Sequence, residues 1–181
     1  MIEITQQPID LNVLVPMVNH PDCGAMVMFV GATRQHTGEI ETAYLEYEAY
    51  DQLALHKMKE LESLARARWP LRSVVMVHRL GKVEVMEPSV AVLVASPHRK
   101  EAFEAAKWLI DELKHQVPIW KREHYVQRGA EWIHPTNGSC SCDHHAGDSI
   151  LAESVSVDQN DVDQQEVARQ ETVQQQQVAQ Q

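Results

Sequence analysis

The segment from Ser96 to Glu123 constrains the fold more than any other, because it holds an amphipathic helix with a clear start and stop. Ser96 and Pro97 favour a helix start: a hydroxyl that accepts from a free backbone N–H, then a ring with a helical φ. Pro118 ends the helix near His115–Val117, because proline lacks the N–H and restricts its predecessor. Spacings of three and four predict one apolar face. That face comprises Phe103, Ala106, Ile110, Leu113 and Val117.

Cationic side chains flank this predicted helix at both ends. His98 and Arg99 stand at its start, where free N–H groups and the positive end of the helix dipole favour an anion. Lys114 lies near its end, and Lys121 and Arg122 follow it. The helix dipole alone would explain one lysine at position 114. Several cations around one short element of an acidic chain indicate an anionic ligand, such as a phosphate or a carboxylate.

The charge of the chain is unevenly distributed. The 181 residues carry a net charge of -10, but eight acidic residues and one arginine lie after residue 138, so residues 1–138 are near neutral. A near-neutral body without a Lys/Arg run argues against nucleic-acid binding. We expect one globular domain over 1–138 and a disordered, Gln- and Asp-rich acidic tail over 139–181. The tail has too few apolar residues to offset the entropy cost of ordering it.

The cysteines do not predict a disulfide framework, because Cys23, Cys140 and Cys142 are few and unevenly placed. Cys140 and Cys142 precede His144 and His145, but this spacing does not match a structural zinc site, so we predict no specific metal site. No apolar run approaches the roughly 20 residues of a membrane span, and the N-terminus lacks a signal-peptide pattern. We therefore expect a cytoplasmic protein.

Short apolar runs and amphipathic helices are interleaved without a regular βαβ order. This favours an α+β fold, a two-layer α/β sandwich with a mostly antiparallel sheet. We expect Val83–Met86 and Val90–Ala95 to pair as a hairpin. The other predicted elements are helices over Leu11–His20 and Leu53–Ala67, and strands over Met1–Ile9, Ala25–Val30, Tyr44–Tyr50, Val74–Val77, Ile119–Glu123 and Trp132–Ile133.

A polar loop, Gly31 to Gly38, follows the predicted strand Ala25–Val30. Such loops commonly present side chains to a ligand, and Arg34 is the candidate here; the alternative is a solvated arginine. Glu46 and Glu48 share one face of a predicted strand, and we expect them to be solvated or paired rather than catalytic.

Six segments occur in order between Ile2 and Trp132: GAMVMFVGATR, LEYEAY, ARWP, VHRLG, SPHRKEAFEAAKW and VPIWKRE. Together they resemble the family of large, catalytic subunits of molybdopterin synthase. The resemblance implies an α/β-hammerhead fold and a sulfurtransferase that converts cyclic pyranopterin monophosphate into molybdopterin, forming its dithiolene. The sulfur would arrive as a thiocarboxylate on the C-terminal Gly-Gly of a small ubiquitin-like partner. The implied assembly is a heterotetramer around a large-subunit homodimer, and no bound cofactor is implied.

The resemblance also implies the site residues. The catalytic residues would be Lys114, which would polarise the thiocarboxylate or transfer protons, and Lys121, which would stabilise negative oxygens. His98 and Arg99 would contact the phosphate or the pterin. The full implied binding set is Ala32, Thr33, Arg34, His98, Arg99, Lys114, Lys121, Arg122 and Glu123.

Two other functions remain open from the residues alone. A non-catalytic module that captures a phosphorylated heterocycle or a peptide carboxylate would use the same cations, but it would tolerate arginine at positions 114 and 121. A phosphoesterase is disfavoured, because no metal cage or nucleophile with its base is evident. Arg99 and Lys114 lie at opposite ends of a helix about 25 to 30 Å long, so we expect both chains of a dimer to contribute to each pocket.

Overall fold

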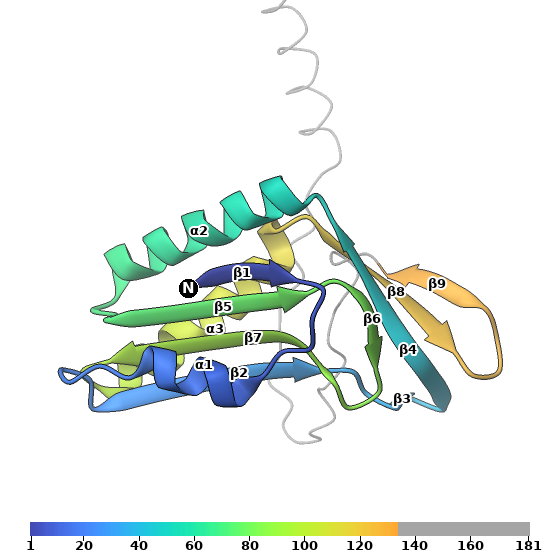
Figure 1. Cartoon of the computed structure of the whole chain (residues 1–181), viewed down its shortest axis with the longest axis horizontal. Helices are drawn as coiled ribbons and strands as arrows, with labels where there is room; N and C mark the ends of the chain where they lie inside the picture. Colours follow the sequence, from blue (N-terminus) through green and yellow to red (C-terminus); the bar gives the residue numbers. More distant parts are fainter. Residues whose placement is uncertain (134–181) are drawn as a thin grey trace, which may run out of the picture. The chain divides into compact units, whose positions relative to one another are not determined.

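Two long apolar strands, β5 (Ser73–Arg79) and β7 (Pro88–Ser96), form the centre of the first sheet, and nearly all their residues are buried. The computed structural model describes residues 1–133. The sheet order is β1-β5-β7-β2, in which β1 (Ile2–Thr5) runs parallel to β5 and β2 (Ala25–Ala32) runs antiparallel to β7. β1 and β2 are therefore its edge strands (Figure 1).

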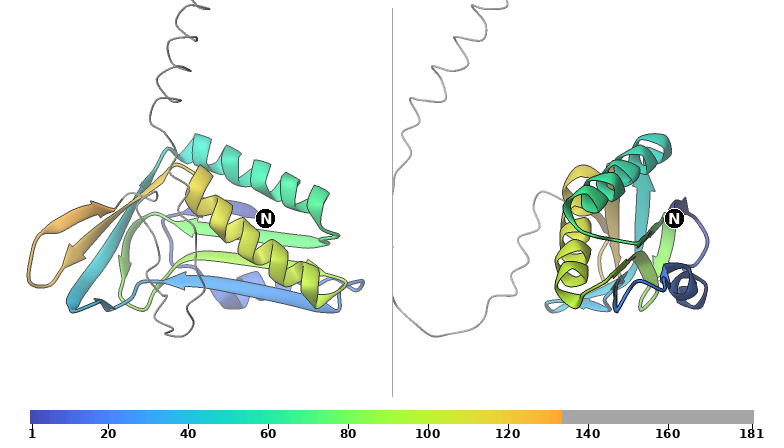
Figure 2. Two further views of the ribbon diagram at one scale, coloured as in Figure 1. Left: turned by 180° about the vertical axis from the view of Figure 1, so that it is seen from behind. Right: turned by 90° about the vertical axis from the view of Figure 1, so that its left-hand side faces the viewer.

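Helices cover both faces of this sheet, which explains why its central strands are apolar on both sides. The helices α2 (Asp51–Arg68) and α3 (Arg99–Gln116) lie side by side on one face (Figure 2). There they bury a core with Met58, Leu61 and Leu109. The shorter α1 (Leu11–Val18) packs on the opposite face, against Val75, Val77, Ala91, Leu93 and Ala95.

A second sheet curls away from the first and is organised around one long strand, β4 (Ile40–Ala49). β4 pairs with β8 (Ile119–Tyr125) along most of its length, and also with β6 (Gly81–Glu84). β3 (His36–Thr37) and β9 (Ala130–Ile133) complete the order β3-β4-β8-β9. Because β8 follows α3 directly, the end of α3 and the second sheet are close in sequence and in space.

The expected α+β class and mostly antiparallel sheets are confirmed. The predicted helix end near His115–Val117 is also correct, since α3 ends at Gln116 with Val117 as its cap. Three local predictions are wrong. Ser96 is the last residue of β7, and His98 is the N-cap, without a side-chain hydrogen bond. Phe103 is 64% exposed, because α3 buries its alanines there instead.

The third wrong prediction is the hairpin. β6 pairs with β4, and β7 pairs with β5 and β2. β7 needs strand neighbours on both sides to pair its buried backbone, and β5 and β2 supply them. The expected domain boundary after residue 138, the disordered tail and the Cys140–His145 segment all lie outside the described residues. Within residues 1–133, no helix is long and apolar enough to cross a membrane.

His78, in β5, is a fully buried imidazole at the junction of the two sheets. Its Nδ1–H donates to the carbonyl of Arg79 at 2.9 Å, and its ring meets the ring of Tyr47 edge to face at 5.0 Å. Burial lowers the pKa of His78 from 6.5 to about 4, since the charged form would lose its hydration. His78 is therefore neutral in the folded protein at neutral pH.

The buried His78 predicts a pH-dependent loss of stability. Between pH 6.5 and pH 4 the unfolded chain takes up a proton that the folded protein does not, so the free energy of unfolding falls as the pH falls. We expect this group to remove about 3 kcal/mol over that window. Chemical denaturation of wild type and His78→Gln at several pH values measures it, and the variant should lack this part of the slope.

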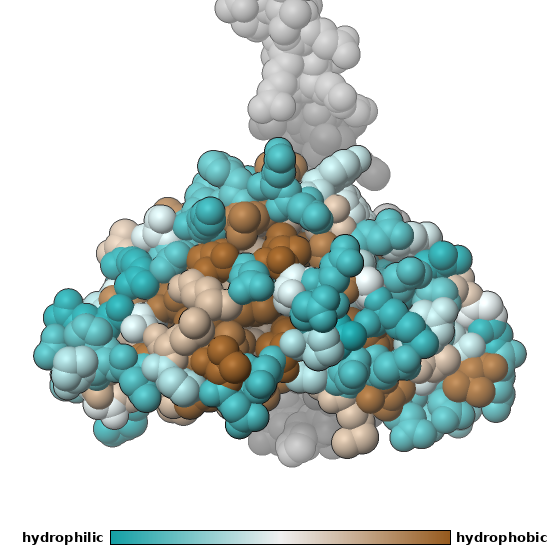
Figure 3. Space-filling model, in the orientation of Figure 1, coloured by the Kyte–Doolittle hydropathy of each residue, from teal (hydrophilic) through white to brown (hydrophobic). Residues whose placement is uncertain are grey.

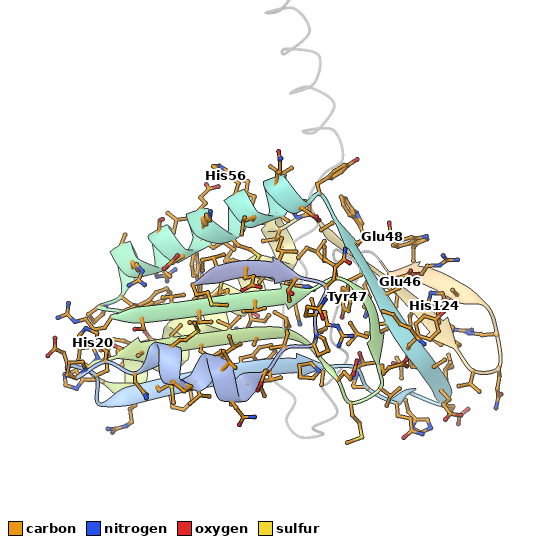
Figure 4. The ribbon with its side chains drawn as sticks, viewed as in Figure 1. His20, Glu46, Tyr47, Glu48, His56 and His124 are labelled. Atoms are coloured by element: carbon orange, nitrogen blue, oxygen red, sulfur yellow. The ribbon has the colours of Figure 1, made fainter. Side chains whose placement is uncertain are left out.

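The matched control for this experiment is His56→Gln, because His56 is exposed on α2 and points outward (Figure 4). This variant keeps the buried His78, so it should keep the part of the slope assigned to His78. A slope for His78→Gln that also matches the wild type would contradict the assignment to His78.

Candidate functional site

A buried carboxylate, that of Glu123 in β8, connects the parts of the predicted site. Glu123 is 4% exposed, and its Oε1 accepts hydrogen bonds from the hydroxyls of Thr42 at 2.5 Å and Thr37 at 3.4 Å. Its Oε2 lies 4.0 Å from the Nζ of Lys121. A buried charge is tolerated only where it is paired and hydrogen-bonded. Glu123 therefore holds Lys121, β4 and the loop before β4 together.

Strand alternation separates Arg122 from its neighbours in sequence. Successive side chains of β8 point to opposite faces, so Lys121 and Glu123 share one face and Arg122 lies on the other. There Arg122 stands opposite Glu46 of β4, with its guanidinium 5.7 Å from the ring centre of Trp132.

The face of β8 that carries Arg122 also carries His124, away from the cluster around Glu123. Its ring stacks on Tyr44 at 4.1 Å, and its Nε2 lies 3.1 Å from Glu46 Oε2. Figure 4 shows Glu46 and His124 on one side of β4 and Tyr47 extending to the other, toward the first sheet. The expectation that Glu46 is paired is confirmed.

The loop after β2 presents one exposed cation. Arg34 is exposed, and Ala32 is exposed at the end of β2. Thr33 between them is 2% exposed. Its N–H donates to Glu87 O at 3.1 Å, its carbonyl accepts from Met86 N at 2.9 Å, and its Oγ1 has no hydrogen-bond partner within residues 1–133. Thr33 thus anchors the loop, while Arg34 faces outward.

The turn that holds Thr33 is itself fixed by charge. Arg79 donates through Nη1 to Glu87 Oε2 at 2.8 Å and through Nη2 to Lys82 O at 2.9 Å. The backbone N–H of Glu84, and then the Arg79 guanidinium, hold the pKa of Glu87 below its usual range. Met86 has a φ of 70°, a left-handed conformation that strains a non-glycine residue. Such strain persists where the surroundings over-determine the backbone.

The start of α3 forms a second cationic region. His98 caps the helix through its backbone only, so the first-turn N–H groups have no side-chain cap from it, and Arg99 is exposed beside them. Lys114 is exposed in the last turn of the same helix. Arg99 and Lys114 are 15 residues apart on α3, so the helix separates them by about 22 Å.

The predicted residues therefore fall into three groups. Lys121 contacts Glu123, Thr37 donates to Glu123 three residues after Arg34, and Lys114 precedes β8 by a short connection. His98 and Arg99 lie at the far end of α3, and Arg122 lies on the opposite face of β8. Sequence reasoning missed Thr37 and Thr42, which donate to Glu123, and Tyr47 and Ser89, whose hydroxyls connect β4 to the carbonyl of Gly31. The alternation in YLEYEAY is the one sequence signal that could have placed Tyr47 on the face of the second sheet that carries Lys121 and Glu123.

A hollow of about 530 Å³ lies away from this site, where α1 ends and β2 begins. Half-buried Cys23 and His20 contribute to its wall, which is about equally polar and apolar. Among residues 1–133, no group of three or more His, Cys, Asp or Glu side chains is placed to hold a metal ion.

Comparisons with known proteins give a consistent result. The family model described as MoaE protein matches residues 4–116. A molybdopterin synthase catalytic subunit of Culex quinquefasciatus is 42% identical over 134 residues, covering 72% of this chain and 85% of the relative. One of Halalkalibacterium halodurans is 37% identical over 130 residues, covering 72% and 83%.

Solved structures agree with the sequence comparisons. The crystal structure of molybdopterin synthase from Staphylococcus aureus superposes with a TM-score of 0.69 at 35% identity, covering 72% of this chain and 95% of that one. A complex of subunits 1 and 2 of the molybdopterin-converting factor from Helicobacter pylori has the same fold, with a TM-score of 0.60 at 24% identity, covering 71% and 87%.

The bond between Thr42 and Glu123 predicts a stability effect. Thr42→Val keeps the shape of the side chain but removes a charge-assisted hydrogen bond to a buried carboxylate, so we expect a loss of about 2 kcal/mol in thermal or urea unfolding. Thr37→Val is the matched control, because Thr37 is exposed and its bond is longer, and it should cost about 0.5 kcal/mol or less. Equal losses in the two variants would contradict the role of Glu123 as a buried, charged acceptor.

Proposed function

The chain belongs to the MoaE protein family of molybdopterin synthase catalytic subunits, and from this premise we propose how its residues carry out the reaction. It acts as a molybdopterin synthase catalytic subunit in molybdenum cofactor biosynthesis. The proposed reaction is sulfur transfer from a thiocarboxylate to cyclic pyranopterin monophosphate, which forms the dithiolene of molybdopterin. The observation that carries the proposal is the contact of Glu123 with Lys121 and with Thr37, which lies three residues after Arg34.

The proposed sulfur donor is the C-terminus of a small ubiquitin-like subunit. The Helicobacter pylori neighbour is a complex of two subunits, which supports a partner of this kind. A thiocarboxylate tail is a thin, extended anion, and it suits a site where the exposed cations Arg34 and Lys114 accompany Lys121.

We assign the activity to residues 1–138, so a chain truncated after Gly138 should retain it.

The two lysines take different roles in this proposal. Lys121 is 32% exposed and oriented by Glu123, so it is suited to stabilising negative charge at a fixed point on the sulfur donor or the phosphate. Lys114 is exposed in the last helical turn, where its amine can reach an incoming tail and exchange protons with it. His98, Arg99 and Arg34 are assigned to the substrate phosphate and pterin.

Lysine substitutions test this assignment in a reconstituted assay. The assay contains this chain, a thiocarboxylated small partner and cyclic pyranopterin monophosphate, and it measures molybdopterin through its fluorescent oxidation product. We expect Lys121→Ala and Lys114→Ala each to lower kcat/KM by about 100-fold or more. Lys114→Arg should also fail, because a guanidinium stays protonated.

Lys107→Ala is the matched control for these variants. Lys107 lies on the same helix, is exposed, and forms a surface ion pair with Asp111, so activity should not change. If Lys114→Arg and Lys121→Arg bind the substrate and partner normally and wild type forms no product, the non-catalytic binding module replaces the synthase mechanism.

The second proposal concerns the dimer. Arg34 follows the end of β2. Gly24, just before the start of β2, donates its N–H to the carbonyl of Pro97, next to His98. Arg34 and His98 therefore lie about 26 Å apart, the length of this strand of eight residues. β2 is an edge strand with exposed Met26 and Met28, and α1 adds exposed Val13 and Met17 on the same side. Figure 3 shows apolar surface around α1 on this face.

An uncharged, proline-free edge strand of this length is normally covered. We propose that it pairs antiparallel with β2 of a second copy. Antiparallel pairing reverses one strand, so it would bring the Arg34 loop of one chain next to His98 and Arg99 of the other. Each pocket of the dimer would then contain both cationic regions, which a single chain keeps apart.

Mixed dimers test the shared pocket. Arg99→Ala and Lys121→Ala chains should each be nearly inactive alone, but co-refolding them should restore about a quarter of wild-type activity, since half of the dimers are mixed and each contains one intact pocket. Conversion is measured in the reconstituted assay. A mixture no more active than its parents would show that each chain supplies its whole pocket.

A further inference from the structure

A β-bulge lies where β2 passes into the Arg34 loop. The pairing of β2 with β7 is regular up to Gly31 opposite Val90, but Ala32 then stands opposite Pro88, so Ser89 has no partner residue on β2. Bulges of this kind re-aim a side chain beside functional sites. Ser89 is 4% exposed, so its hydroxyl needs partners within the protein.

The Ser89 hydroxyl finds these partners in two different strands. It donates to the carbonyl of Gly31 in β2 at 3.2 Å and accepts from the Tyr47 hydroxyl of β4 at 3.3 Å. The side chain of Val90 fills the space beside Gly31, since a Cβ on Gly31 would lie 2.7 Å from Val90 Cγ1. The end of β2 is therefore held by one short relay, Tyr47 to Ser89 to Gly31.

Tyr47 connects this relay to β8, the strand that carries Lys121. In the second sheet it stands directly opposite Lys121 of β8 and opposite Gly81 of β6. Its ring is fixed edge to face against His78 at 5.0 Å. Desolvation raises the pKa of Tyr47, opposed by its bond to Ser89 and reinforced by the charge of Glu123, so its hydroxyl remains a donor at neutral pH.

We propose that Tyr47 and Ser89 are positioning residues that hold the Arg34 loop at a set distance from Lys121. The relay ends at Gly31, three residues before Arg34, and begins opposite Lys121. It is independent of the Thr37–Glu123 contact, which holds the other end of the same loop. This inference rests on the proposed function only in assigning substrate contacts to Arg34 and Lys121.

The kinetic test uses Tyr47→Phe and Ser89→Ala in the full chain with the small partner. We expect KM for cyclic pyranopterin monophosphate to rise about fivefold in each, with kcat within twofold, while the lost hydrogen bond lowers the melting temperature by about 2 to 5 °C. In an Arg34→Ala background Tyr47→Phe should cause no further rise, because the group that it positions is absent. Tyr50→Phe is the matched control: Tyr50 is 67% exposed against Trp120, and its KM should equal wild type.

Three kinetic outcomes would overturn the proposal. They are an equal rise in KM with Arg34→Ala already present, a fall in kcat that follows lost stability at unchanged KM, and a rise for Tyr50→Phe as large as that for Tyr47→Phe. The first would mean that the relay does not act through Arg34. The second and third would mean that the hydroxyl only stabilises the fold.

A second measurement does not depend on turnover. Hydrogen exchange of the backbone amides of residues 32–36 should become faster in Tyr47→Phe and Ser89→Ala but not in Tyr50→Phe. Unchanged exchange in the first two variants would overturn the proposal. If wild type formed no molybdopterin, the proposed function would fail, and hydrogen exchange would still decide whether the relay positions the loop.

Discussion

The burial of one negative charge, on Glu123, determines most of the site around it. A carboxylate with 4% exposure is stable only with compensating donors, and Thr42, Thr37 and Lys121 supply them. These partners come from β4, from β3 beyond the Arg34 loop, and from β8 itself. Satisfying the buried charge therefore also brings a loop from the end of the first sheet to a lysine on the second.

Side-chain hydrogen bonds join the two sheets at this site. Tyr47 and Ser89 link β4 to the end of β2, and Arg79 with Glu87 fixes the turn that receives the Thr33 backbone. Each link is made by buried or half-buried polar groups that are costly to leave unpaired. Their combined effect is a loop with a fixed base and an exposed Arg34, an arrangement suited to an anionic substrate.

The cationic side chains assigned to the substrate lie too far apart within one chain for a small molecule to contact all of them. α3 places Arg99 and Lys114 about 22 Å apart, and β2 separates Arg34 from His98 by a similar length. A cyclic pterin phosphate is much smaller than this distance. The proposed antiparallel pairing of two β2 edges resolves the difficulty with a single two-fold axis, and it covers Met26 and Met28.

The sequence by itself determined the α+β class, the family and most of the elements, although β3 lies within a predicted loop. Periodicity placed α2 and α3, and proline placed the end of α3 but not its start, because amphipathic spacing and proline act locally. The quoted segments indicated the family that the comparisons then showed. Tertiary structure decided which strands pair, so β6 joined β4 instead of forming a hairpin with β7. It also decided that Arg122 faces away from Lys121 and that Ser89, a residue without any local signal, contacts both Tyr47 and Gly31. Local patterns report how a segment folds, whereas partners distant in sequence are selected by packing and by the need to pair every buried polar group.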